Sequence, residues 1–183
     1  MRALYRVLPY LHDAERGEPG HPLHVPPSTG AGRIDNPERY DVLYVGDNPA
    51  CAVAEAFGWA PRWTAGLLRG PPALPGSMRA LVTYELPDDA AICDLDDADR
   101  LVELALRPSR VVTRDRAVTQ AWALDLFARG EFVGARWWSY YHPEWGSLGL
   151  WAPAQLTVAH VAPLTVDHPA LLDAAAAIVR VIG

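Results

Sequence analysis

Short apolar runs alternate along this chain with long stretches of proline, glycine and polar residues. Aliphatic and aromatic runs bounded by turn residues are typical of strands, and apolar residues three and four positions apart are typical of helices. The pattern predicts strands over residues 3–11, 41–46, 78–86, 91–95, 132–141, 148–151 and 155–161. It predicts helices over residues 49–58, 96–106, 114–129 and 169–181. Strands and helices are interspersed without a strict βαβ order, which favours the α+β class.

Two long loops, residues 12–36 and 61–76, hold so many prolines and glycines that regular structure is not expected there. A structureless loop as long as the first is usually functional or mobile. The sequence leaves open whether it is a lid over an active site or a mobile edge. No repeat and no linker divides the chain, so we expect one domain over residues 1–183.

The basic residues are unusual, because all 16 of them are arginine and none is lysine. The absence of lysine excludes a Schiff base, a pyridoxal phosphate anchor and the lysine of a phosphate-binding loop. Any anion must therefore be bound by arginine side chains, backbone N–H groups or helix N-termini. The 22 acids give a formal net charge of -6 and the arginines are scattered, so direct nucleic-acid binding is not expected.

The sequence also argues against a membrane span, a metal centre and a disulfide framework. No stretch approaches the ~20 apolar residues that cross a bilayer, and the N-terminus lacks a signal-peptide core, so a cytoplasmic protein is expected. The six histidines lack metal-ligand spacing. Cys51 and Cys93 lie far apart and are expected to be reduced core residues.

The helix predicted over residues 49–58 carries a single charged residue, Glu55. Asp47 or Asn48 is expected to cap this helix, and Gly58 to end it. Its larger apolar residues form one stripe at helical spacing, whereas Glu55 shares the other side with small residues that let a ligand approach closely. Because an unpaired buried charge is costly, Glu55 either pairs with an arginine elsewhere or serves a function.

Two arginines stand out by their surroundings. Arg33 follows a Gly-Ala-Gly sequence, where the backbone can approach a ligand closely while the guanidinium reaches an anion. The alternative for Arg33 is a solvent-facing position in a loop. Arg6 is a charge within an apolar strand, and the alternative for it is a surface position on an edge strand.

The predicted strand that ends at Tyr141 is dense in aromatic residues. Strand alternation places Trp137, Ser139 and Tyr141 on one face and Trp138 and Tyr140 on the other. A hydroxyl between flat rings suits a heteroaromatic ligand, and the alternative is a core face with an incidental serine. Ser139 has no Gly-x-Ser-x-Gly surroundings, so a hydrolase-type serine nucleophile is not indicated.

Together these segments resemble the RES domain, a family named for an arginine, a glutamate and a serine in that order. The matching residues are Arg33 in Gly-Arg-Ile-Asp-Asn, Glu55 in Val-Ala-Glu and Ser139 in Arg-Trp-Trp-Ser. A family strand that ends in Leu-Tyr matches Tyr44, and an early Tyr-Arg pair matches Arg6 with the tyrosine before it. The resemblance spans nearly the entire chain.

Two positions depart from the family pattern. Ile34 stands where many members carry an aromatic residue, and Ser139 lies in a Trp-rich context instead of a Tyr-Pro-Ser type sequence. Either departure would change how the ring of a ligand is stacked.

The resemblance implies a fold similar to ADP-ribosyltransferases, with a mixed or antiparallel β core and flanking helices. It also implies a toxin that degrades NAD+ and is neutralised by an Xre-type antitoxin. NAD+ would be the substrate, and no cofactor or metal is expected. Arg6 and Arg33 would hold the pyrophosphate, Glu55 would stabilise an oxocarbenium-like transition state, and Tyr44 and Ser139 would orient the nicotinamide riboside.

Two other functions stay open on the residues alone. Transfer of ADP-ribose to a macromolecule would use the same donor site as hydrolysis or phosphorolysis of NAD+. A module that binds a nucleotide or a partner protein without turnover would use the aromatic residues and long loops as contact surfaces. Exposed apolar area would also allow self-association into a homo-oligomer.

Overall fold

A seven-stranded sheet spans the computed structural model, which describes residues Met1–Gly183. The strand order is β5-β6-β7-β2-β1-β4-β8, and every neighbouring pair is antiparallel except β5 and β6. The strands are β1 (Arg2–Tyr10), β2 (Leu43–Gly46), β4 (Met78–Leu86), β5 (Ile92–Asp94), β6 (Gly134–Trp138), β7 (Gly146–Leu150) and β8 (Thr157–Pro163). Two short strands, β3 (Arg62–Trp63) and β9 (Val181–Ile182), form a separate parallel pair.

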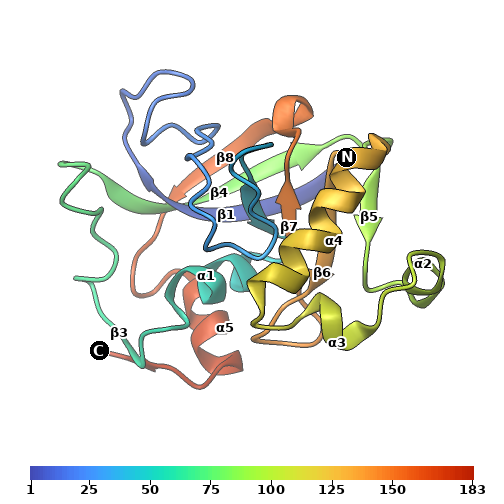
Figure 1. The fold of residues 1–183 in the computed structure, drawn as a ribbon. Helices are drawn as coiled ribbons and strands as arrows, with labels where there is room; N and C mark the ends of the chain where they lie inside the picture. Colours follow the sequence, from blue (N-terminus) through green and yellow to red (C-terminus); the bar gives the residue numbers. More distant parts are fainter.

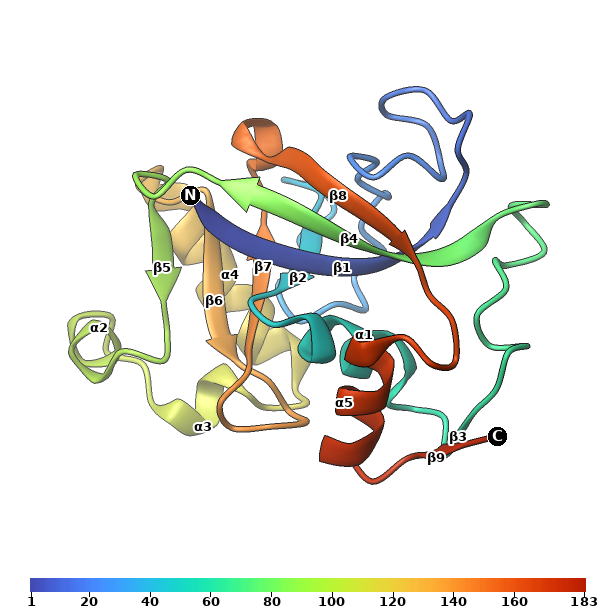
Figure 2. The same cartoon turned by 180° about the vertical axis from the view of Figure 1, so that it is seen from behind.

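The two halves of the large sheet meet at a narrow contact between β1 and β2. β1 pairs with β4 along its whole length, whereas it pairs with β2 at one register position, Tyr5 opposite Gly46. Figures 1 and 2 show β1, β4 and β8 running across β5, β6 and β7, as the right-handed twist of strands allows. Because β1 and β2 pair so briefly, their side chains leave room for a cavity at this point.

Helices pack beside the sheet in two groups (Figure 1). α1 (Pro49–Phe57) and α5 (Pro169–Ala177) contact each other, and their buried residues form one apolar cluster. α4 (Arg116–Arg129) and the short α3 (Pro108–Val111) bury a second cluster against β6. The remaining helices are α2 (Ala98–Glu103) and a 3-10 turn (Pro153–Gln155). The mostly antiparallel sheet with helices packed beside it confirms the α+β class.

Helix α1 begins and ends as its sequence indicates. Asn48, one of the two expected caps, accepts hydrogen bonds from the backbone N–H groups of Ala50 and Cys51. Gly58 ends the helix and donates to the carbonyl of Ala54. The cap fixes where α1 starts relative to β2, which ends only two residues before it.

Several predicted boundaries are wrong by a few residues. The strand over residues 78–86 is confirmed residue for residue, but the one expected over 132–141 ends at Trp138. The 148–151 strand begins earlier, at Gly146, and the 155–161 strand is shifted to Thr157–Pro163. The 96–106 helix is shorter, the 114–129 helix starts at Arg116, and α3 between them was not predicted.

The C-terminal helix is also shorter than predicted. The alanine-rich pattern favours helix over residues 169–181, but α5 ends at Ala177. Val179 has a φ of 54°, a left-handed conformation that a β-branched residue rarely adopts. This reversal lets β9 pair with β3, which lies inside the loop expected over residues 61–76.

Cys51 and Cys93 are both buried and free, as expected. None of the helices combines the length and the apolar character that a membrane span requires. No three His, Cys, Asp or Glu side chains are grouped so that they could hold a metal ion.

Candidate active site

A cavity of about 360 Å³ lies where β1 and β2 meet. Its walls come from β1, β2, α1, the start of α4, the β6–β7 hairpin, and the turn that holds Gly32 and Arg33. Three arginines and one carboxylate are its charged lining residues: Arg6, Arg33, Arg116 and Glu55. The volume is at the small end of the ~300–1,000 Å³ range of ligand sites. The cavity is therefore locally cationic in a protein whose formal net charge is -6.

The Glu55 carboxylate is held through one of its two oxygens. Ser139 Oγ donates to Glu55 Oε1 at 2.8 Å, and Ser147 Oγ donates to the same oxygen at 3.0 Å. The serines approach from the two sides of the β6–β7 hairpin, since Ser139 follows β6 and Ser147 lies in β7. No protein donor contacts Oε2. One carboxylate oxygen is therefore fixed in place while the other is left for a ligand.

Glu55 is not the buried charge that its small neighbours in the sequence suggest. Glu55 is an exposed residue at the cavity wall, so its charge retains contact with solvent and carries no large desolvation cost. It forms no ion pair with any arginine, so the expected alternative of a paired carboxylate is wrong. What distinguishes Glu55 is the pair of serine donors rather than burial.

Ser139 lies behind Glu55 and does not line the cavity. Its side chain is buried at 3% exposure, and it accepts a hydrogen bond from the backbone N–H of Tyr141. The geometry thus makes Ser139 a positioning residue for the carboxylate, instead of a direct contact for the nicotinamide riboside. Ser147, which does line the cavity, was missed because a serine in an otherwise apolar strand has no local signature.

Arg33 is fixed against the segment that connects α3 to α4. Its Nη1 donates to the carbonyls of Val111 at 2.8 Å and Thr113 at 3.0 Å. The guanidinium carbon lies 5.8 Å from the centre of the Trp137 ring, within cation–π range. Burial lowers the pKa of Arg33, the nearby charge of Arg116 lowers it further, and Glu55 partly offsets both. The solvent-facing alternative for Arg33 is therefore wrong.

The glycine-rich turn before Arg33 folds around the carboxylate of Asp35. Asp35 accepts hydrogen bonds from the backbone N–H groups of Gly30 at 3.1 Å and Gly32 at 2.9 Å. A Cβ on Gly32 would overlap both Asp35 and the Tyr44 hydroxyl, so only glycine fits there. The glycines shape the turn and place Arg33 at the cavity wall.

Tyr44 uses its hydroxyl inside this turn. The hydroxyl donates to Asp35 Oδ1 at 2.6 Å and accepts from the backbone N–H of Ile34 at 3.1 Å. Burial raises the pKa of Tyr44, and the hydrogen bond to Asp35 raises it further. The ring of Tyr44 lines the cavity and meets Trp137 edge to face. Its hydroxyl is thus committed to holding the turn, and its ring is the part that a ligand meets.

Ile34, one of the two departures from the family pattern, points into the core. It is fully buried, and its side chain reaches the space that a Cβ on Gly149 would fill. The departure at Ile34 therefore changes core packing and does not change the stacking surface of the cavity.

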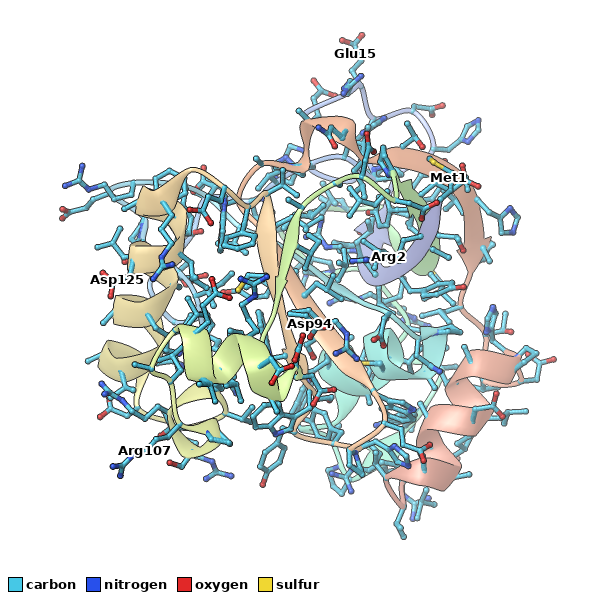
Figure 3. The ribbon with its side chains drawn as sticks, turned by 90° about the vertical axis from the view of Figure 1, so that its right-hand side faces the viewer. Met1, Arg2, Glu15, Asp94, Arg107 and Asp125 are labelled. Carbon is cyan, nitrogen blue, oxygen red and sulfur yellow. The ribbon has the colours of Figure 1, made fainter.

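Arg6 lies on an interior strand, so the edge-strand alternative is wrong. Its Nη1 donates to the carbonyl of His24 at 3.1 Å, and burial lowers the pKa of Arg6. Tyr84 on β4 donates to the carbonyl of Pro22 at 2.6 Å. The second half of the 12–36 loop is thus tied to the sheet, whereas Glu15 near its tip projects away from the molecule (Figure 3).

The aromatic residues after β6 do not follow the alternation that the sequence predicts. Trp137 and Tyr140 both line the cavity, although the pattern places them on opposite faces. The reason is that β6 ends at Trp138, and the hairpin turns there. Tyr140 is 66% exposed and accepts a hydrogen bond from Arg114 Nη2 at 3.1 Å. An exposed ring therefore borders the cavity.

A second charged cluster is centred on Arg136 of β6, and its arginine is fully paired. Arg136 bonds to Asp47 through Nε at 3.1 Å and Nη2 at 3.0 Å, and through Nη1 to Asp94 and Asp96 at 3.1 Å each. Asp47 in turn accepts from the backbone N–H of Gly146 at 2.8 Å. Figure 3 shows Asp94 at the end of β5, beside α2. This cluster fixes the start of β7, immediately before Ser147.

Residues 3–172 match the model of the RES domain family, so the protein belongs to that family. A chain of the M. tuberculosis MbcT–MbcA toxin–antitoxin complex has a similar structure, with a TM-score of 0.60 and 18% sequence identity. That match covers 90% of this chain and 84% of the other. No curated protein matches the chain. The comparisons confirm the family resemblance and the fold that the sequence indicates.

Proposed function

We propose that this protein cleaves the bond between nicotinamide and ribose in NAD+. The observation that carries the proposal is the Glu55 carboxylate, fixed by two serines on one oxygen and free on the other, in a cavity whose other charged lining residues are all arginines. A dinucleotide carries charges of both signs that complement the charged residues of the cavity. Its phosphates suit the arginines, and the ribose next to its nicotinamide develops positive charge when the bond breaks.

The chemistry needs little from the protein at the leaving group. The electron pair of the broken bond moves to the nicotinamide nitrogen, which loses its positive charge and departs neutral, so no general acid is required. The ribose is left as an oxocarbenium-like cation, which a fixed carboxylate stabilises electrostatically. Water or inorganic phosphate then bonds to the same ribose carbon, and water gives up one proton to solvent.

Within this scheme the residues divide into contact and positioning roles. Glu55 Oε2 faces the ribose, and Arg6 and Arg33 lie where the phosphates would be neutralised. Ser139 and Ser147 keep the carboxylate from rotating, so that no reorganisation is needed as charge develops. Trp137 and the ring of Tyr44 provide flat surfaces for the nicotinamide.

The biological role that we propose is that of a toxin restrained by an antitoxin. The support is membership of the RES domain family and the similarity to a chain from a toxin–antitoxin complex. NAD+ depletion in the cytoplasm would be the toxic effect. An antitoxin of the Xre type that covers the cavity would stop it by denying NAD+ access to Glu55.

The proposal is tested by incubating purified protein with NAD+ and separating the products by chromatography. We expect nicotinamide in equal amounts with ADP-ribose, or with a phosphorylated ADP-ribose when phosphate is the acceptor. Label from NAD+ that appears in a macromolecule instead would show a transferase. Tight NAD+ binding by calorimetry, with no product after long incubation, would show a binding module and overturn the proposal.

A further inference from the structure

Asp47 joins the element that carries Glu55 to the hairpin that carries the two serines. It stands between the end of β2 and the Asn48 cap of α1. Its backbone N–H donates to the carbonyl of Gly146 at 3.0 Å, and its Oδ1 accepts from the backbone N–H of the same glycine at 2.8 Å. Its Oδ2 receives the guanidinium of Arg136. Two hydrogen bonds and an ion pair therefore connect the start of α1 to β7 and β6.

Three residues along α1 face the start of β7. Cys51 and Glu55 are four positions apart and so lie on one side of the helix, and Asp47 lies four positions before Cys51, where the helix begins. The Cys51 thiol donates a weak hydrogen bond to the carbonyl of Gly146, with the sulfur 3.6 Å from the oxygen. Glu55 accepts from Ser147, one residue further along β7. The contacts therefore follow each other in order along both elements.

The contact between Asp47 and Gly146 leaves no space for a side chain on β7. A Cβ on Gly146 would overlap both the Asp47 carboxylate and the Arg136 guanidinium. Glycine at this position therefore lets the backbone of β7 come close enough to accept and donate both bonds. These bonds hold β7 against the start of α1 at the residue before Ser147.

The two serine hydrogen bonds to Glu55 depend on where α1 lies relative to the β6–β7 hairpin. Glu55 belongs to α1, whereas Ser139 and Ser147 belong to the hairpin. Their hydroxyl oxygens lie 2.8 and 3.0 Å from Glu55 Oε1, and a displacement of about 1 Å would take both bonds out of range. A residue that fixes the start of α1 against the hairpin therefore also fixes the carboxylate.

We propose that Asp47 is a positioning residue for the reaction, which holds Gly146 so that the Glu55 carboxylate meets its two serine donors. This inference rests on the proposed function, in which that carboxylate acts on the ribose. The bonds to Gly146 carry the positioning role, whereas the ion pair with Arg136 contributes to stability. The two contacts of the Asp47 side chain can therefore be removed separately.

The test compares the kinetics of nicotinamide release from NAD+ in two variants. Arg136→Met removes the ion pair and leaves both bonds to Gly146, so we expect an unchanged kcat although stability falls. Asp47→Ala also removes the Oδ1 acceptor, and we expect kcat to fall by about 10- to 100-fold with little change in KM, because the carboxylate is misplaced but the rest of the cavity is intact. Thermal unfolding verifies that both variants are folded at the assay temperature.

A conservative substitution provides the rescue. Asparagine keeps one oxygen that can accept from the Gly146 N–H, but that oxygen cannot serve Gly146 and Arg136 together. We therefore expect Asp47→Asn alone to lower kcat less than Asp47→Ala. Adding Arg136→Met to Asp47→Asn removes the competing guanidinium and should restore kcat. Should Asp47→Ala fail to fold, the single and double asparagine variants replace it.

Crystal structures of these variants separate this inference from the proposed function. The distance between Ser147 Oγ and Glu55 Oε1 is 3.0 Å in the wild type, and we expect it to leave hydrogen-bonding range in Asp47→Ala but not in Arg136→Met. That result supports the positioning of Glu55 even where the wild type releases no nicotinamide. An unchanged distance in Asp47→Ala, or an equal fall in kcat in Asp47→Ala and Arg136→Met, would overturn the inference even where nicotinamide is released.

Discussion

The cavity and the Arg136 cluster use the same kinds of charged residue in opposite ways. In the cluster, one arginine bonds to three aspartates, and one of these aspartates also holds the backbone of Gly146. In the cavity, three arginines and Glu55 form no ion pair at all. Paired charges brace the fold, whereas unpaired charges that share a cavity are available to a ligand. The difference favours the cavity as the place where the proposed reaction occurs.

The largest effect is expected from removing the unpaired carboxylate. Glu55→Ala should lower nicotinamide release by about 100- to 1,000-fold, because a fixed charge opposite the transition state is lost. In cells, expression of the wild type should deplete NAD+ and stop growth, whereas the variant should do neither. The measurement is cellular NAD+ after induction, with equal protein levels verified. An NAD+ pool that collapses equally with both proteins would contradict the role of Glu55.

The paired cluster is expected to affect stability instead. Arg136→Met leaves three carboxylates without their partner, and we expect the free energy of unfolding to fall by about 1–3 kcal/mol. Partial burial alone would lower the pKa of Arg136, but the acids around it outweigh burial and raise that pKa. Denaturant unfolding measures the loss. For comparison, we expect Arg116→Gln to change the free energy of unfolding by no more than about 0.5 kcal/mol. A larger loss of stability in Arg116→Gln than in Arg136→Met would contradict the stabilising role of the Arg136 cluster.

Ser139 and Ser147 connect the cavity with the Arg136 cluster, because that cluster fixes the β6–β7 hairpin that carries both serines. Ser139→Ala and Ser147→Ala each remove one hydrogen bond to Glu55 Oε1. We expect each to lower kcat by about 10-fold, with little change in the Kd for ADP-ribose. Ser109→Ala, at an exposed position outside the site, is the control. Unchanged kcat in both serine variants would show that the hydrogen bonds to Glu55 Oε1 do not contribute to catalysis.

The smallest effect is expected on the pH dependence of stability, through the thiols of Cys51 beside the cavity and Cys93 beside the Arg136 cluster. Burial raises the pKa of Cys51 to about 12, with Glu55 adding to the rise, and burial raises that of Cys93 to about 11. Above about pH 9 the unfolded chain releases thiol protons that the folded chain keeps, so the free energy of unfolding falls as pH rises. Urea unfolding at pH 8 and 10 measures this loss. Cys51→Ala and Cys93→Ala should each reduce this loss by a similar amount, and an unchanged loss in both variants would contradict the raised pKa values.

Local patterns were enough to predict most elements but not where they end. The strand over residues 78–86 is long and has an apolar and β-branched centre from Ala80 to Tyr84, and it is found as predicted. The C-terminal helix was predicted to extend past Ala177, although its alanines end there and the β-branched residues Ile178 and Val179 that follow favour extended structure. That end is set by the pairing of β9 with β3, a contact between residues far apart in the sequence.

The candidate site could be predicted where a residue contrasts with its neighbours. Glu55 is the lone charge of its helix, and Arg33 follows two glycines, so both were found. Ser147 gives no such signal, because its role depends on β6 and β7 bringing it beside Ser139. Arg116 also contrasts with its surroundings, since a base in the first turn of a helix opposes the helix dipole.

The most direct test of the account is a time course of nicotinamide release from NAD+ by the purified wild type beside Glu55→Gln. Glutamine keeps the size of the side chain and removes only the charge, so ADP-ribose calorimetry should show similar binding by both proteins. The account predicts steady release by the wild type and about 100- to 1,000-fold slower release by the variant. No release by the wild type, or equal release by both, would contradict it.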